Sequence, residues 1–99
     1  MSDDIVVRLA ANGDEETLQF DGESVDRLCR PTSIELLRTV ADEEPASIRE
    51  TARLVDRDVR QVHDNLWKLG ELGLVEFDRS GRGHRPVVDW DRIDVEIDV

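Results

Sequence analysis

Residues 47–86 read "SIRETARLVDRDVRQVHDNLWKLGELGLVEFDRSGRGHRP", and this stretch decides the fold class. Ser47 and Glu50 have the spacing of a capping box, in which both side chains bind backbone N–H groups at the start of a helix. They predict a short helix over residues 48–55 that ends at the polar pair 56–57. Its apolar residues, which we expect to be buried in some combination, are Ile48, Ala52, Leu54 and Val55.

A longer helix is predicted over residues 58–70. Asp58 and Gln61 have the spacing of a second capping box at its start. A single apolar stripe follows at helical intervals and consists of Val59, Val62, Leu66 and Leu69. Gly73 stands where a residue with left-handed backbone would end the helix. Two helices therefore meet across a very short turn.

Two β-hairpins are expected. Strands over 74–79 and 85–90 flank "SGRGH", a turn too polar and too rich in glycine for a core. Strands over 5–10 and 17–20 flank "ANGDEE", whose Asn-Gly pair favours a tight turn. The chain is therefore predicted to combine helices with antiparallel strands.

Two further helices are expected between these hairpins. The first covers residues 22–30, with Val25, Leu28 and optionally Cys29 facing inward. The second lies within 31–45, where Thr32 or Ser33 can cap its first turn and Pro45 closes it. Its apolar residues at helical spacing are Ile34, Leu37, Val40 and Ala41.

The net charge of −11 is distributed unevenly. Residues 1–48 hold 12 acidic and four basic residues, and residues 89–99 hold five and one. Residues 49–88 hold seven and eight, so only this segment is not repelled by a polyanion. Lys68 is the only lysine. This composition resembles that of proteins from salt-accumulating haloarchaea, although an acidic protein from another source is the alternative.

Several classes of protein are excluded by composition. Ninety-nine residues fit one small domain, no apolar run approaches the roughly 20 residues of a membrane helix, and the acidic start does not resemble a signal peptide. We therefore expect a cytoplasmic protein. Cys29 is the single cysteine and only two histidines are present, so we expect no disulfide, metal or cofactor. Because no catalytic triad or phosphate-binding loop is recognisable, we do not expect an enzyme.

The order of helix, tight turn, longer helix and β-hairpin is that of a winged helix-turn-helix. The quoted stretch resembles winged-helix transcriptional regulators of the MarR and ArsR type and, more particularly, small haloarchaeal predicted regulators of that kind. The resemblance covers about residues 32–90, and "LWKLGELGLVEF" is its most specific part. It implies an α+β fold in which a three-helix core with a β-hairpin wing occupies residues 23–90. An N-terminal hairpin extension, residues 1–22, and a C-terminal strand or tail, residues 91–99, flank this domain.

The resemblance implies a sequence-specific regulator that binds double-stranded DNA. In that family the longer helix enters the major groove, and the matching residues here are Arg57, Arg60, Gln61, Asp64, Asn65 and Lys68. The start of the short helix would contact the DNA backbone through Ser47 and Arg49. The wing residues that would contact phosphates or the minor groove are Arg79, Arg82, His84 and Arg85.

Some of these assignments have alternatives. Gln61 can be held back by Asp58 in the capping box. Asp64 stands where the family often has a basic residue, and it would face either a cytosine amino group or a basic residue on its own helix. The wing arginines can instead balance Glu76 and Asp78.

A single winged domain offers a small DNA interface, so we expect a homodimer on a two-fold site. The hairpin 5–20 and the alternating tail "RIDVEIDV" are candidate dimer elements, and the tail can equally pack within its own subunit. The rival prediction is a winged-helix module, or an antitoxin-like autorepressor, that binds a partner protein through its terminal segments.

Overall fold

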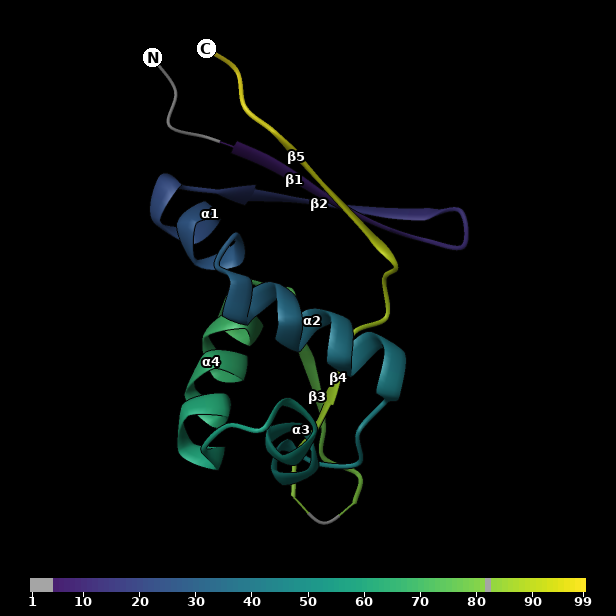
Figure 1. The fold of residues 1–99 in the computed structure, drawn as a ribbon. Helices are drawn as coiled ribbons and strands as arrows, with labels where there is room; N and C mark the ends of the chain where they lie inside the picture. Colours follow the sequence, from purple (N-terminus) through teal and green to yellow (C-terminus); the bar gives the residue numbers. More distant parts are fainter. Residues whose placement is uncertain (1–4, 82) are drawn as a thin grey trace.

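The computed structural model describes residues 5–81 and 83–99. Within these residues the fold is α+β, as predicted: a three-stranded antiparallel sheet lies at one end, and four helices and a two-stranded hairpin lie on one side of it (Figure 1). The molecule is elongated, with principal extents of 44 × 29 × 19 Å. None of the helices described is long and apolar enough to cross a membrane.

The three-stranded sheet joins the two ends of the chain. Strands β1 (Ile5–Ala11) and β2 (Asp14–Phe20) form the predicted hairpin. Asn12 and Gly13, with φ of 50° and 88°, make the two-residue turn that an Asn-Gly pair favours. Strand β5 (Arg92–Glu96) pairs antiparallel with the other side of β1. One edge of the C-terminal strand is therefore paired within its own subunit.

The two faces of this sheet differ in polarity. Val7, Leu9 and Phe20 are buried against the helices. On the opposite face Arg8 lies between two carboxylates, with Nη2 2.7 Å from Glu96 Oε2 and Nε 3.8 Å from Glu15 Oε1. The hydrogen bond to Glu96 is the main reason that the pKa of Arg8 is raised. The outer face is thus polar and the inner face forms part of the core.

Helix α1 (Gly22–Leu28) is shorter than predicted. Its N-cap is Asp21, whose carboxylate accepts a hydrogen bond from the Ser24 N–H at 2.8 Å, and this bonding lowers the pKa of Asp21. Leu28 is buried and Val25 is half-buried, as expected. Cys29 lies beyond the helix and is exposed, so the inward position allowed for it was wrong.

Helix α2 (Pro31–Glu43) begins one residue before the predicted caps. Pro31 occupies its first position, where a proline already has the helical φ and its missing N–H costs nothing. The expected cap by Thr32 or Ser33 was therefore wrong, because both residues lie inside the helix. Glu44, in left-handed backbone with φ of 47°, ends α2 just before Pro45.

The buried face of α2 differs from the predicted stripe. It consists of Ser33, Leu36, Leu37 and Val40. Ile34 is only half-buried and Ala41 is exposed, so this part of the prediction was wrong. Because α2 packs against α1, α3, α4 and β4, its apolar residues are shared between several contacts, and no single stripe accounts for them.

Helices α3 (Ile48–Val55) and α4 (Val59–Glu71) occur within one residue of their predicted bounds. Between them Asp56 adopts left-handed backbone with φ of 55°, and the Arg57 N–H donates to the Ala52 carbonyl at 3.0 Å. This bond gives a carbonyl in the last turn of α3 a hydrogen-bond donor, and the chain turns directly after the helix. The very short turn predicted between the two helices is therefore present.

Five apolar residues of α3 and α4 are buried. Ile48, Ala52, Val62, Leu66 and Leu69 lie in the core. Leu54 and Val59 are 45% and 38% exposed, so the stripe on α4 begins one turn later than predicted. Thr51 is buried in place of Leu54, and its hydroxyl donates to the Ser47 carbonyl at 2.9 Å.

Gly73 ends α4 as predicted. Its φ is 85°, its N–H donates to Gly70, and the Leu74 N–H donates to Leu69, both at 3.0 Å. These two bonds form a Schellman motif. Leu74 and Val75 then enter the core before the next strand begins.

Strands β3 (Glu76–Asp78) and β4 (Arg85–Val87) form the second hairpin and are shorter than expected. The residues that follow β4 no longer pair with β3 and instead pack against the core. Among them, Trp90 donates its indole N–H to the Leu74 carbonyl at 3.0 Å. This contact fixes the segment that leads from the second hairpin to β5.

Candidate nucleic-acid interface

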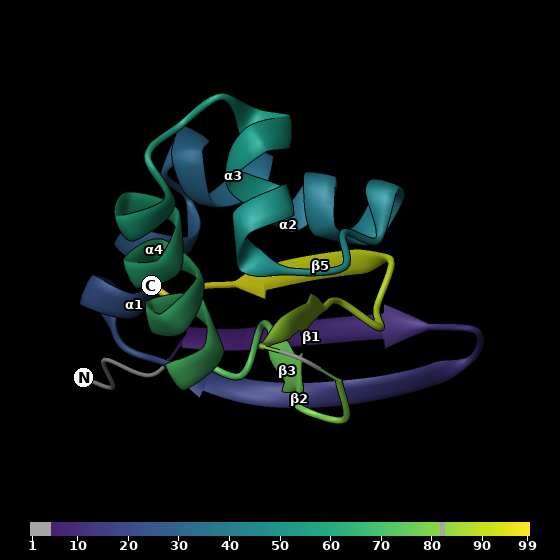
Figure 2. The same ribbon diagram turned by 90° about the horizontal axis from the view of Figure 1, so that it is seen from below.

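One end of the molecule brings together the elements that carry most of the predicted site residues. Helix α3, the first turn of α4 and the loop side of the β3–β4 hairpin lie away from the three-stranded sheet (Figure 1). Seen from that end, α3, α4 and the β3–β4 hairpin are all visible, with the three-stranded sheet behind them (Figure 2). Side chains from three separate elements can therefore face one partner.

The first two turns of α4 present a polar surface. Arg60, Gln61 and Asp64 are exposed and Asn65 is half-buried. The Asp58 carboxylate caps the helix by accepting from the Arg60 N–H at 3.1 Å. The predicted capping box with Gln61 was therefore wrong, because the cap closes one residue earlier.

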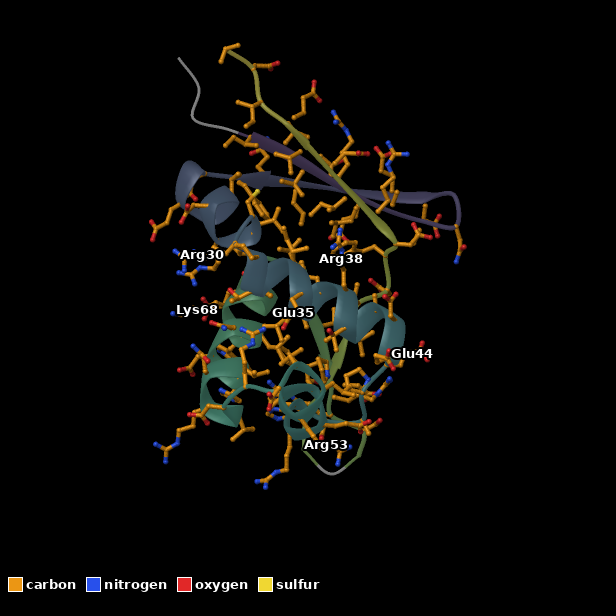
Figure 3. All side chains as sticks on the ribbon, in the orientation of Figure 1. Arg30, Glu35, Arg38, Glu44, Arg53 and Lys68 are labelled. Carbon is orange, nitrogen blue, oxygen red and sulfur yellow. The ribbon has the colours of Figure 1, made fainter. Side chains whose placement is uncertain are left out.

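Asp64 does not form the ion pair with a basic residue of α4 that was its alternative role. Its Oδ1 lies 3.6 Å from Nδ1 of His63. Within the described part of the chain, no ion pair joins Asp64 to Arg60 or Lys68. Lys68 extends outward from α4 further toward the sheet end (Figure 3).

Arg57 is turned inward. Its side chain is 16% exposed, and Nη2 lies 3.2 Å from Glu35 Oε1 and 3.4 Å from the Thr32 carbonyl oxygen of α2. Nη1 is buried without a hydrogen-bond partner within the described residues. The geometry makes Arg57 a positioning residue that joins the turn before α4 to α2, and separates it from the other residues predicted to read bases.

The start of α3 has one half of the predicted capping box, because Glu50 bonds the residue before the N-cap Ser47 and not Ser47 itself. The Ser47 hydroxyl accepts from the Glu50 N–H at 3.0 Å, and the Glu50 carboxylate accepts from the Ala46 N–H at 3.1 Å. Arg49 is exposed on the same helix. Arg53, which we did not assign to the site from the sequence, also extends from α3 at this end of the molecule (Figure 3). The signal for Arg53 in the sequence was its position within residues 49–88, the segment that is not acidic overall.

The base of the β3–β4 loop is held by a carboxylate. Asp78 Oδ1 accepts from the Ser80 N–H at 2.9 Å, and Oδ2 lies 3.0 Å from Arg85 Nη2. Hydrogen bonding from Ser80, followed by the Arg85 guanidinium, lowers the pKa of Asp78 from 3.8 to about 2. Arg85 thus has the acidic partner named as an alternative, and both Arg79 and Arg85 are exposed. Arg82 lies outside the described residues.

An aromatic cluster that the sequence did not indicate connects α4 to this hairpin. Trp67 stacks on His63 with ring centroids 5.8 Å apart and lies 6.3 Å from His84. Phe77 of β3 lies 5.3 Å from Trp67 and 6.4 Å from His84. His84, one of the residues predicted to contact DNA, is therefore half-buried beside these rings. We define these four residues as the aromatic cluster.

A hollow lies between α2 and the three-stranded sheet. This cavity of about 620 Å³ is lined by apolar side chains, including Ile34, Ala41 and Ile93, and by the indole of Trp90. Its rim carries both Arg38 and Asp42. Across residues 5–81 and 83–99, no three His, Cys, Asp or Glu side chains are placed to hold a metal ion.

The fold and this polar end define a small α+β protein with two helices joined by a tight turn and followed by a β-hairpin. The family model HVO_A0114 matches residues 28–95, which is more than half of the chain, so the chain belongs to that family. The match covers α2, α3, α4, the β3–β4 hairpin and all but the last residue of β5. It leaves out the β1–β2 hairpin and all of α1 except its last residue. No curated protein matches the chain.

Proposed function

We propose that the chain is a winged helix-turn-helix protein that binds double-stranded DNA and regulates transcription as a homodimer. The observation that carries this proposal is the grouping of exposed basic side chains from α3, α4 and the β3–β4 hairpin at the end of the molecule away from the acidic sheet. In this arrangement α4 is the recognition helix and the hairpin is the wing.

Base reading is assigned to the first two turns of α4. Arg60 can donate two hydrogen bonds to guanine O6 and N7, and Gln61, released from the helix cap, can bond adenine in the same bidentate manner. Each such pair gives about 1–3 kcal/mol of discrimination between bases. Asp64 is free to accept from a cytosine amino group. These three side chains supply the sequence preference.

Phosphate contacts are assigned to exposed arginines on the flanking elements. Arg49 and Arg53 of α3 and Arg79 at the start of the loop are exposed and carry positive charge on the two elements next to α4. Such contacts position the protein on the duplex without reading bases. The acidic sheet would repel DNA, so the complex is oriented with α3 and α4 toward the duplex.

The proposal is tested by selecting DNA fragments from a random pool with the purified chain at several KCl concentrations and sequencing the bound fraction. We expect enrichment of one motif with two-fold symmetry. Enrichment must persist in the variant Arg30→Ala, because Arg30 is an exposed arginine at the N-cap of α2, away from the proposed DNA-binding end, and pairs with Asp26 at 3.1 Å. A bound fraction with the composition of the input pool at every salt concentration would contradict the proposal and favour a protein-interaction module.

A further inference from the structure

Strand β5 and the residues after it carry apolar side chains that remain exposed. Val95, Ile97 and Val99 are 39%, 57% and 124% exposed, and they are half of the exposed large hydrophobic residues within the described chain. Val95 stands opposite the fully buried Val7 in the β1–β5 ladder, so it lies on the apolar face of the sheet. At β5, the helices therefore leave part of this apolar face uncovered.

The two edges of the sheet differ in their ability to accept another strand. The edge strand β2 begins with three exposed acidic residues, Asp14, Glu15 and Glu16, and charged side chains on an edge oppose pairing with a second chain. Strand β5 has an alternating apolar row instead. An open edge with exposed apolar residues is a template for strand addition.

The backbone of β5 has free hydrogen-bonding groups on this edge. Ala11 and Asp14 flank a two-residue turn and form a hydrogen-bonded pair, so the next residue of β1, Ala10, directs its backbone groups toward β5. The Asp91 N–H accordingly donates to the Ala10 carbonyl at 2.9 Å. By the alternation of an antiparallel ladder, Ile93 and Val95 direct their N–H and C=O groups away from β1.

We propose that β5 pairs antiparallel with β5 of a second copy of this chain, about a two-fold axis at Val95. This register places Val95 opposite its counterpart and Ile93 opposite Ile97 of the second copy, which covers the exposed apolar row. Arg92 then stands opposite Asp98 of the second copy, an attractive pair. The result is one continuous six-stranded sheet.

The polar face of the paired strands tolerates this register. Asp94 stands opposite Glu96 of the second copy, which is a like-charge pair. Within each chain, however, Glu96 binds Arg8 at 2.7 Å and Asp94 lies 3.3 Å from Arg92 Nε. These arginines offset much of the repulsion, and dissolved salt screens the remainder. Dimerisation is therefore expected to strengthen as the salt concentration rises.

This pairing also gives the geometry that the proposed function needs, and this step rests on that function. The helices lie on one side of the sheet (Figure 1), and a two-fold axis between antiparallel strands runs perpendicular to the sheet. Both helical bodies therefore lie on the same side of the six-stranded sheet, and both α4 helices point away from it. Two recognition helices that face one duplex are what a two-fold DNA site requires.

The register is tested by cross-linking through cysteine. Each variant also carries Cys29→Ser, because the native thiol is exposed. Hydrogen-bonded antiparallel residues have Cα atoms about 5.5 Å apart, within the range of a disulfide. Val95→Cys is therefore expected to form a disulfide-linked dimer under mild oxidation in concentrated KCl. Thr17→Cys, exposed on the opposite edge strand β2, is the matched control and is expected to stay monomeric on non-reducing gels.

The association itself is tested by sedimentation of the full chain without DNA. We expect a mass of twice 11.3 kDa for the unaltered chain and 11.3 kDa for Ile97→Glu. Leu54→Glu makes the same change at a comparably exposed residue of α3 and is expected to remain a dimer. Monomer at every concentration, an Ile97→Glu dimer, or equal cross-linking at Thr17 would overturn the proposal. A β5 dimer that enriches no DNA leaves this inference standing and removes the proposed function. A monomer that enriches DNA removes this inference and leaves the proposed DNA binding without its homodimer.

Discussion

The ring of Trp67 on α4 lies 5.3 Å from the ring of Phe77 on β3, with 30° between their planes. This contact ties the helix proposed to read bases to the hairpin proposed to contact phosphates. Aromatic pairs of this kind contribute about 0.5–1.5 kcal/mol beyond the burial of their area. The hairpin therefore has a defined orientation relative to α4 before any DNA is bound.

Gly70→Ala is expected to disturb that orientation. A Cβ at Gly70 would lie 2.8 Å from Phe77 Cε2 and 3.3 Å from the Val75 carbonyl oxygen. Because the Phe77 ring is held by Trp67 and His84, the hairpin must shift, and we expect a net loss of about 1–2 kcal/mol of unfolding free energy. Urea denaturation measures this loss.

Gly81→Ala is the matched control for that substitution. A Cβ at Gly81 meets no atom within 4 Å, and its φ lies outside the left-handed region. We expect the unfolding free energy to change by less than about 0.5 kcal/mol. Equal losses in the two variants would show that the Gly70 contact with Phe77 does not orient the hairpin.

Arg60→Ala and Arg79→Ala are expected to weaken DNA binding in different ways. Removing Arg60 takes away donors to a base edge, so the preference at one position of the enriched motif relaxes, at a cost of about 1–3 kcal/mol. Removing Arg79 takes away a phosphate contact, so all sequences weaken similarly and the salt dependence becomes shallower. Titrations on the preferred motif and on single-base variants measure both effects. The same pattern of loss in both variants would show that the roles are misassigned.

Arg57→Ala is expected to lower stability while leaving the base preference unchanged. The side chain is mostly buried and contacts both Glu35 and the Thr32 carbonyl, so its loss should cost about 1–2 kcal/mol of unfolding free energy. A double-mutant cycle with Glu35→Ala should give a coupling of about 0.5 kcal/mol, because Glu35 is 55% exposed and its charge is screened. A relaxed base preference in folded Arg57→Ala would instead place Arg57 at the bases.

Asp78→Asn is expected to remove one contribution to the free energy of unfolding that depends on pH in the acidic range. The folded-state pKa of Asp78 is lowered from 3.8 to about 2, so its contribution is present above 3.8 and is lost as the pH falls through about 2. The difference in Tm between the unaltered chain and Asp78→Asn should therefore be positive at neutral pH and shrink across that window. Asp42→Asn, an exposed carboxylate on α2, controls for the loss of one negative charge. A Tm difference that is constant with pH would contradict the role given to Asp78.

Local signals in the sequence predicted the helices and turns well. The spacing of Ser47 and Glu50 set the start of α3, and Gly73 marked the end of α4, because caps depend on residues within one helical turn. Asn12 and Gly13 likewise located the first hairpin turn, since only residues that accept positive φ fit there. These features need no information from distant parts of the chain.

Features that depend on distant contacts were not predictable in this way. Arg57 and Glu35 are 22 positions apart, so nothing near Arg57 indicated that its guanidinium would turn toward α2. The aromatic cluster joins residues from α4 and the second hairpin that share no common periodicity. The sequence therefore identified elements that lie together at one end of the molecule, whereas the orientation of individual side chains came only from the structure.

The pairing of β1 with β5 gives the protein an order of assembly. Val6 pairs with Glu96, so the sheet is completed by the last strand of the described chain to be synthesised. Until β5 emerges from the ribosome, β1 has one open edge, while α3 and α4 can already pack together. Closing so long a loop is entropically costly and tends to occur late in folding. A nascent chain would thus form its helix–turn–helix segment before it gains the strand through which we propose that two copies meet.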